Sequence, residues 1–148
     1  MISFTIKYFN ELNIHELYAL LQLRSEVFVV EQDCVYQDID GKDNKALHVL
    51  GFKHNQLVAY TRVFRSGDYF ENASIGRVIV KETERKHKYG FEIMNASIHA
   101  INEHFNETVI KISAQKYLES FYMSLGFKTV SEPYLEDGIP HIAMLLKP

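Results

Sequence analysis

The residues best suited to chemistry form a short basic run directly before a long amphipathic segment. They are Arg85, Lys86, His87, Lys88, Tyr89 and Gly90. At the start of a helix, free backbone N–H groups and the positive end of the helix dipole point toward one place. A glycine there lets the backbone approach a ligand closely. The run therefore predicts an anion-binding loop, for which a phosphate-bearing ligand is well suited.

Two strands and one helix are expected to position this loop. A β-branched run over Ser74 to Val80 precedes it, and Gly76 inside that run indicates a bulge or the close approach of another backbone or ligand. After Gly90, apolar residues recur at helical spacing as far as Phe105, and Thr108 to Ala114 is the next expected strand. A strand–helix–strand unit of this kind favours a right-handed parallel crossover.

The remaining segments predict five more strands and two more helices. We expect the strands at 3–9, 47–53, 57–65, 127–130 and 141–146, and the helices at 14–29 and 115–125. Turns at 54–56 and 137–138 imply antiparallel neighbours. The order of elements predicts a single α/β (α+β) domain over residues 1–148, with a mixed sheet and helices on both of its faces.

Composition narrows the class of protein. The 148 residues carry a net charge of −3, which argues against a protein that coats nucleic acid. Cys34 is the only cysteine, so an internal disulfide is impossible and a cysteine-based metal site is not expected. The N-terminus lacks a secretory pattern, and no apolar run approaches membrane-spanning length. We therefore expect a cytoplasmic protein with no metal, no nucleic-acid partner and no membrane contact.

The first predicted helix carries a charge at a position where an apolar residue is expected. Arg24 lies in the centre of a stripe formed by Leu17, Leu20, Leu21 and Phe28. Because an unpaired buried charge is costly, this guanidinium needs an anionic partner. Either a nearby carboxylate of the chain or a bound substrate or cofactor would serve.

The segment from Glu31 to Ala46 is acidic and rich in turn residues. Asp38, Asp40 and Asp43 raise the question of calcium, but the glycine comes too early for an EF-hand loop and no glutamate closes it. A solvated loop and a loop over a binding site both remain open. An acidic loop over the site would attract a cationic amine.

Three features together resemble the GCN5-related N-acetyltransferase (GNAT) superfamily. The loop from Arg85 to Gly90 is similar to the family motif Arg/Gln-x-x-Gly-x-Gly/Ala, except that Lys88 stands where the family has a small residue. Tyr122 to Phe127 is similar to the Tyr-x-x-x-Gly-Phe signature, and the element order also matches. Four further segments resemble the ElaA-like branch of the superfamily, namely 23–32, 38–40, 76–78 and 136–141.

The resemblance implies a mostly antiparallel sheet with a splayed central strand, and transfer of an acetyl group from acetyl-CoA to a small-molecule or protein amine. The implied cofactor-binding residues are Val78, Ile79, Val80 and Gln115 together with Arg85, Lys86, His87, Lys88, Tyr89 and Gly90. We expect Tyr122 to donate a proton to the departing thiolate. Substrate contacts are expected from Arg24, Phe28 and His48, and a homodimer would fit such a fold.

The sequence leaves open which group removes a proton from the amine. The candidates are Glu26, Glu31, His48 and His141, and a carboxylate acting through an ordered water is as plausible; we place Glu31 and His141 beside Tyr122 as catalytic residues. Cys34 as a covalent nucleophile would need a histidine partner that the sequence does not identify.

Two other functions remain open at this point. One is a CoA-binding sensor or interaction module without turnover, for which the departure at Lys88 is the main argument. The other is an acyltransferase resembling acyl-homoserine-lactone synthases, which share the fold and an early Arg-x-x-x-Phe, as at Arg24 and Phe28. This chain is shorter than those enzymes and keeps the acetyltransferase-like tyrosine helix.

Overall fold

The computed structural model describes residues 1 to 148, in which eight strands form one sheet. Its order is β1-β2-β3-β4-β5-β8-β6, and β7 also pairs with β8. The strands are β1 (Ser3–Tyr8), β2 (Leu47–Lys53), β3 (Gln56–Phe64), β4 (Ala73–Val80), β5 (Ile110–Gln115), β6 (Lys128–Thr129), β7 (Tyr134–Glu136) and β8 (Ile139–Leu146). Only β4 and β5 run parallel, so the expected mixed, mostly antiparallel sheet is confirmed.

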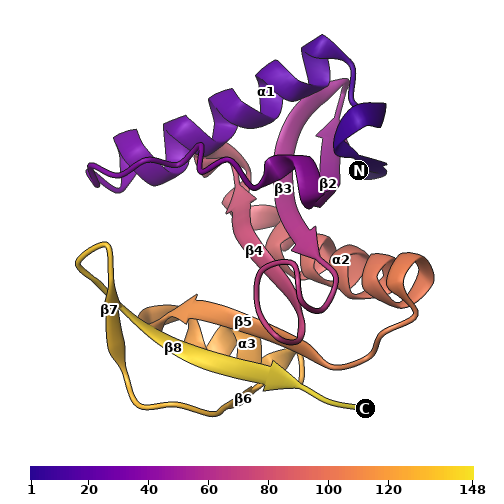
Figure 1. The fold of residues 1–148 in the computed structure, drawn as a ribbon. Coiled ribbons are helices and arrows are strands. Elements are labelled where there is room, and N and C mark those ends of the chain that lie inside the picture. The colour runs from indigo at the N-terminus through magenta and orange to yellow at the C-terminus, as the bar shows by residue number, and fades with distance from the viewer.

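Helices cover both faces of this sheet, as predicted (Figure 1). One face carries α1 (Ile14–Arg24), which continues directly into the π-helical segment η2 (Ser25–Glu31). The other carries α2 (Tyr89–Phe105) and α3 (Glu119–Ser124). The short 3-10 helices are η1 (Phe9–Glu11), η3 (Asp43–Lys45), η4 (Glu82–His87) and η5 (Lys116–Leu118).

Alternation along the central strands builds two separate cores. Val49 of β2 belongs to the core beneath α2, while its neighbour Leu50 belongs to the core beneath α1. Successive residues of a strand point to opposite faces, so a strand covered on both faces is apolar at most of its positions. This is why β2 and β3 are nearly continuous hydrophobic runs.

The sheet opens between its two parallel strands. β4 pairs with β5 only at Ala73 and Ser74, beyond which the two strands diverge (Figure 1). β4 also bulges against β3, because Tyr60 is opposite Ile79 whereas Arg62 is opposite Gly76. The predicted bulge and the expected splay of the central strand are therefore both present.

Several predicted boundaries were wrong. The helix expected at 115–125 is one 3-10 turn followed by a six-residue α-helix, and α2 begins at Tyr89 rather than after Gly90. We missed β7, because its three residues are all exposed and carry no hydrophobic pattern. Asp137 and Gly138 both adopt positive φ angles (52° and 76°), which suits the tight two-residue turn that joins β7 to β8.

Candidate active site

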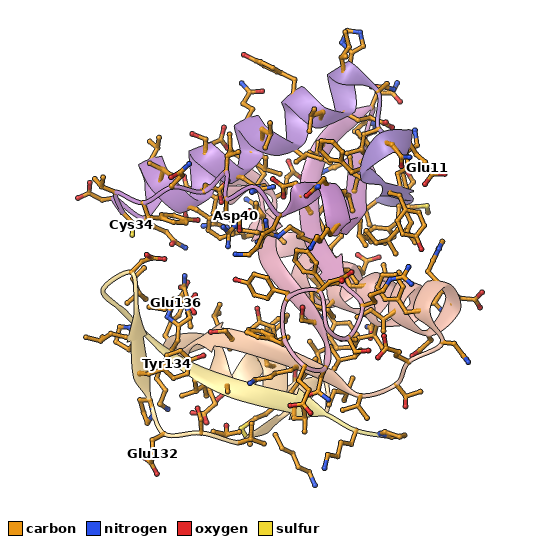
Figure 2. The ribbon with its side chains drawn as sticks, viewed as in Figure 1. Glu11, Cys34, Asp40, Glu132, Tyr134 and Glu136 are labelled. Atoms are coloured by element: carbon orange, nitrogen blue, oxygen red, sulfur yellow. The ribbon has the colours of Figure 1, made fainter.

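A cleft of about 760 Å³ occupies the opening between β4 and β5. One wall is β4 together with η2. The other consists of β5, β8, the β7–β8 turn and α3, and the N-terminal turn of α2 closes one end. Figure 2 shows side chains of the two halves of the molecule facing each other across this opening, with Cys34 on one side and Glu136 on the other. Ligands commonly bind in concave sites of this size.

The backbone of β4 presents hydrogen-bonding groups to the cleft. The N–H of Lys81 donates to the carbonyl of Val58 in β3, at 2.8 Å. Because the backbone groups of a strand point alternately to its two neighbours, those of Ile79, two residues earlier, also point toward β3. Val80 and Val78 then direct their backbone groups the other way, toward the cleft. The carbonyl of Val80 accepts from Nε of Arg85 at 2.9 Å, which fits this assignment.

The basic loop lies at the end of the cleft beside α2. Arg85, Lys88 and Gly90 line the cleft, whereas the side chains of Lys86 and His87 are exposed outside it and Tyr89 is buried in the core. Lys88 has a φ of 62°, in the left-handed region, where a residue with a Cβ atom is strained. A Cβ atom at Gly90 would meet Phe121 at 3.5 Å, an ordinary contact, which is compatible with the glycine or alanine of the family motif.

Tyr122 lies in the wall of the cleft formed by α3. Its side chain is buried, and its ring packs edge-on against Phe121 and Phe127. Burial, with a smaller contribution from Tyr117, raises the pKa of its hydroxyl above the usual value. The group is therefore protonated at neutral pH and available as a proton donor.

His141 stands in β8, opposite Gln115 of β5, and both residues line the cleft. Its Nδ1–H donates to the carbonyl of Ile139 at 2.7 Å, which leaves Nε2 as the proton-accepting nitrogen of the neutral ring. Nε2 lies 3.5 Å from a carboxylate oxygen of Glu136. Ser113 holds that carboxylate by donating to its other oxygen at 3.0 Å.

Glu31 lines the cleft at its opposite rim and is bound to the basic loop. Its Oε1 accepts from Nη2 of Arg85 at 2.8 Å, and its Oε2 accepts from Nη1. Both oxygens of Glu31 are thus paired with the guanidinium of Arg85. Among the catalytic residues that we expected, the structure thus brings Tyr122 and His141 to the cleft with unoccupied reactive groups, and Glu31 only as half of an ion pair.

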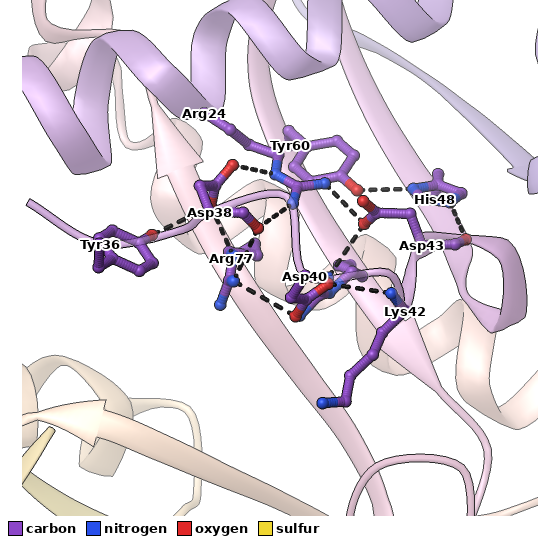
Figure 3. Close-up of polar contacts among 10 residues, drawn as sticks. Arg24, Tyr36, Asp38, Asp40, Lys42, Asp43, His48, Tyr60 and Arg77 are labelled. Atoms are coloured by element: carbon purple, nitrogen blue, oxygen red, sulfur yellow. Dashed lines mark hydrogen bonds and ion pairs between the residues drawn. The ribbon is translucent and has the colours of Figure 1, made fainter. Parts of the chain in front are cut away.

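Arg24 and His48 do not line the cleft, contrary to the expected substrate contacts. Arg24 is fully buried, with Nε 2.9 Å from Asp38 and Nη1 2.7 Å from Asp43 (Figure 3). Of its two predicted partners, the carboxylate of the chain is the one present. Phe28, one helical turn further on, does line the cleft.

His48 is fully buried between two partners of the chain. Its Nε2 donates to the carbonyl of Asp43 at 3.0 Å, so Nδ1 accepts from the Tyr60 hydroxyl at 2.6 Å (Figure 3). Burial lowers the pKa of this imidazole, with the cations of Arg24 and Arg62 acting in the same direction. The ring has no nitrogen left for a substrate, so its place is in the buried network.

The same network explains the acidic segment after η2. Arg62 donates to both carboxylate oxygens of Asp40, at 2.8 and 2.9 Å, and Arg77 donates to Asp38. Burial of Asp40 disfavours its charge, but the hydrogen bonds and charges of Arg62 and Arg77 outweigh that effect and lower its pKa to about 2. The aspartates of the segment are thus held in ion pairs, while Cys34 and Tyr36 of the same segment line the cleft.

Among the residues of the cleft to which sequence reasoning assigned no role are Arg77, Ser113 and Glu136. The signal for the first was a charge inside an apolar strand, because an arginine within Ser-Ile-Gly-Arg-Val-Ile-Val requires a partner. The other two had no signal, since they come from two strands, β5 and β7, that only pairing with β8 brings together.

The fold and the cleft define a class of protein with an acyltransferase architecture. The sequence profile of the acetyltransferase (GNAT) domain matches residues 13–148. Protein ElaA of Escherichia coli is 47% identical over 146 residues, which cover 97% of this chain and 95% of ElaA. The chain thus belongs to the GNAT acetyltransferase family, and it is ElaA-like.

Solved structures agree with this membership. The crystal structure of E. coli ElaA matches with a TM-score of 0.92 at 46% identity, over 99% of this chain and 100% of that one. An acyl-CoA N-acyltransferase from Pseudomonas aeruginosa matches with a TM-score of 0.93 at 39% identity, over 99% of each chain. A GNAT family acetyltransferase from Elizabethkingia anophelis with acetyl-CoA bound shares the fold, with a TM-score of 0.67 at 15% identity over 99% and 98% of the two chains.

Two further observations concern metal binding and membrane crossing. No three side chains among the His, Cys, Asp and Glu residues are grouped so that they could hold a metal ion. None of the helices combines the length and the apolar character that crossing a membrane requires.

Proposed function

We propose that this chain is an N-acetyltransferase that uses acetyl-CoA and transfers the acetyl group directly to an amine. The observation that carries the proposal is the cleft between β4 and β5, which has the basic loop at one end and the Tyr122 side chain in its wall. The fold neighbour that binds acetyl-CoA supports the choice of co-substrate. We keep a cytoplasmic site of action and a small-molecule or protein amine as parts of this proposal, and a homodimer stays a prediction.

The chain offers matching groups for the pyrophosphate and for the pantetheine arm of the co-substrate. Backbone N–H groups from Arg85 to Gly90, at the start of α2, bind the pyrophosphate, and the cationic side chains of Arg85 and Lys88 offset its charge. The backbones of Val78 and Val80 bond the pantetheine arm as an added strand would. The diverging β5 leaves room for that arm, and Gln115 lies at the end of β5 beside it.

His141 and Tyr122 move the protons of the reaction. His141 Nε2 accepts a proton from the ammonium form of the acceptor, and the carboxylate of Glu136 stabilises the resulting imidazolium. The free amine attacks the thioester carbonyl, and the N–H of Val78 stabilises the oxyanion. As the C–S bond breaks, Tyr122 donates its proton to the sulfur. The nitrogen, which now carries the acetyl group, gives its second proton to the Tyr122 oxygen, so that a neutral amide and free CoA result.

The test combines binding with turnover. The melting temperature of the chain is measured with saturating acetyl-CoA and with CoA, and release of free thiol is followed with a broad panel of amines. We expect stabilisation by both ligands and thiol release with a subset of the amines. An unchanged melting temperature would refute the phosphate-binding loop. Stabilisation without thiol release for any amine would favour the CoA-binding sensor instead.

A further inference from the structure

Arg77 is the one member of the buried ion-pair network that also lines the cleft. It sits at the bulge of β4, with a φ of 49° that turns its side chain out of the regular strand pattern. Its side chain remains 17% exposed, whereas those of Arg24 and Arg62 are 0% and 2% exposed. The bulge therefore delivers a guanidinium to the part of the cleft where β4 and β5 have separated.

Contacts on one edge hold this guanidinium in place. Nε donates to Oδ1 of Asp38 at 2.8 Å, and Nη2 donates to the carbonyl of the same residue at 3.1 Å. Nη2 also lies 3.4 Å from Asp40, and the ring of Tyr36 lies 5.7 Å from the guanidinium carbon. Asp38 and Asp40 are themselves fixed by Arg24 and Arg62. The cation is thus preorganised and cannot swing away without breaking its ion pairs with Asp38 and Asp40.

The opposite edge is free. Nη1 of Arg77 makes no hydrogen bond within the chain. It is not a buried atom either, so it is in contact with solvent. Figure 3 shows this nitrogen on the side of Arg77 that faces away from the network. A guanidinium whose N–H groups point into a concave site is a binding group for a carboxylate.

The other wall of the cleft carries the opposite charge. Glu136 and Asp137 belong to the β7–β8 hairpin, and Glu136 lies beside the proton-accepting nitrogen of His141. An ammonium group is attracted to this wall, and a carboxylate is attracted to Arg77. The two walls are therefore complementary to a molecule that carries both groups.

We propose that the acceptor is an amine that also bears a carboxylate, and that the free Nη1 of Arg77 binds this carboxylate while the amine is held at Glu136 and His141. The inference rests on the proposed acetyltransferase activity and goes beyond it, because it names the class of acceptor and the residue that selects it. Arg77 acts on recognition and not on proton transfer.

The experiment compares matched acceptors on the unaltered protein. α-, β- and γ-amino acids are each assayed with acetyl-CoA beside the corresponding amide and the amine that lacks the carboxylate. We expect kcat/KM for the carboxylated member of the best series to exceed that of its partners by about 10- to 100-fold, the usual size of a charge-assisted hydrogen bond. Equal or better rates for the amides and simple amines would overturn the inference and leave the acetyltransferase proposal standing.

Two variants of Arg77 and one control variant test whether Arg77 selects the acceptor. Arg77→Gln should raise KM for the carboxylated acceptor about 10-fold or more and leave KM for acetyl-CoA unchanged, while Arg77→Lys should retain part of the preference. Arg65→Gln, which removes an exposed arginine outside the cleft, should leave the preference unchanged. Equal loss for carboxylated and uncharged acceptors in Arg77→Gln would assign Arg77 a structural role only and overturn the inference.

A binding measurement tests carboxylate recognition by Arg77 even without turnover. In the presence of CoA, a carboxylated amine of the preferred series should raise the melting temperature of the wild-type chain, and its amide should not. If CoA itself gives no stabilisation, the acetyltransferase proposal fails first. If CoA stabilises but the carboxylated amine and its amide behave alike, only the inference on Arg77 fails.

Discussion

Arg85 donates to both carboxylate oxygens of Glu31, which lies 54 positions earlier in the chain, and the pair joins η4 to η2 at the rim of the cleft. The third nitrogen of the Arg85 guanidinium, Nε, donates to the carbonyl of Val80. All three nitrogens therefore donate to the chain, although the side chain is 42% exposed. Phosphate binding by Arg85 must compete with Glu31.

The first prediction follows from that competition. Glu31→Gln should lower KM for acetyl-CoA by about 3- to 10-fold, because it releases Arg85 and removes a negative charge near the phosphates. The free energy of unfolding should change by less than about 1 kcal/mol, since exposed ion pairs contribute little. Steady-state kinetics and denaturant titration measure the two quantities. Glu26→Gln, in the same η2 segment but outside the cleft lining, is the control, and a higher KM in Glu31→Gln would contradict the argument.

Tyr122 allows a test of the proton donor. Tyr122→Phe should lower kcat by about 10²- to 10⁴-fold and leave the dissociation constant of acetyl-CoA unchanged. Because burial raises the pKa of this hydroxyl, the wild-type rate should not decline through its ionisation up to about pH 10. Tyr117→Phe, another tyrosine of the same cleft, is the matched control. Full activity of Tyr122→Phe across the pH range would remove Tyr122 from the mechanism.

His141 is tested through the acceptor. His141→Asn should lower kcat by about 10²-fold or more with an amine that is protonated at the assay pH. The loss should be much smaller with an amine of low pKa, because that acceptor arrives already deprotonated and needs no base. Rates for the two kinds of amine are compared in the variant and in His99→Asn, whose side chain is exposed on α2. The same loss for both amines would show that His141 does not act as the base.

Lys88 carries a local strain that can be removed. Its φ of 62° lies in the left-handed region, where glycine is relaxed and other residues are not. Lys88→Gly should therefore raise the free energy of unfolding by about 1 kcal/mol, measured by denaturant titration. KM for acetyl-CoA shows whether the charge of Lys88 or only the backbone conformation of the loop matters for binding. If the ammonium contacts phosphate, KM should rise in both Lys88→Gly and Lys88→Asn. An unchanged KM in both variants would leave phosphate binding to the backbone alone.

Asp40 links stability to pH. Its pKa is about 2 in the folded chain, below the value of about 3.9 for an unfolded aspartate, so its ionised form stabilises the fold above pH 4 and this contribution is lost as the pH falls toward 2. The contribution of the shift is roughly 2 kcal/mol. The difference in unfolding free energy between wild type and Asp40→Asn should thus shrink between pH 5 and pH 2. Glu132→Gln, at an exposed carboxylate without an ion pair, should give a constant difference.

The sequence alone determined the order and kind of most elements. The start of α1 is an example, because Asn13 and Glu16 form a capping box there and both partners lie within one helical turn. Strand β2 has the predicted limits, and the bulge signalled by Gly76 occurs in β4, directly after that glycine. These features depend on residues close together in the chain, so local spacing and backbone preference are sufficient to find them.

Only the tertiary structure decided which charged side chains pair with one another. Arg24 was expected to meet either a carboxylate or a substrate, and packing of the acidic segment against α1 buries it with Asp38 and Asp43. The same packing leaves Arg77, which had no assigned role, as the arginine of the network that reaches the cleft. These partners lie 14, 19 and 39 positions apart, and only the fold fixes which of them meet and which edge of a guanidinium stays free.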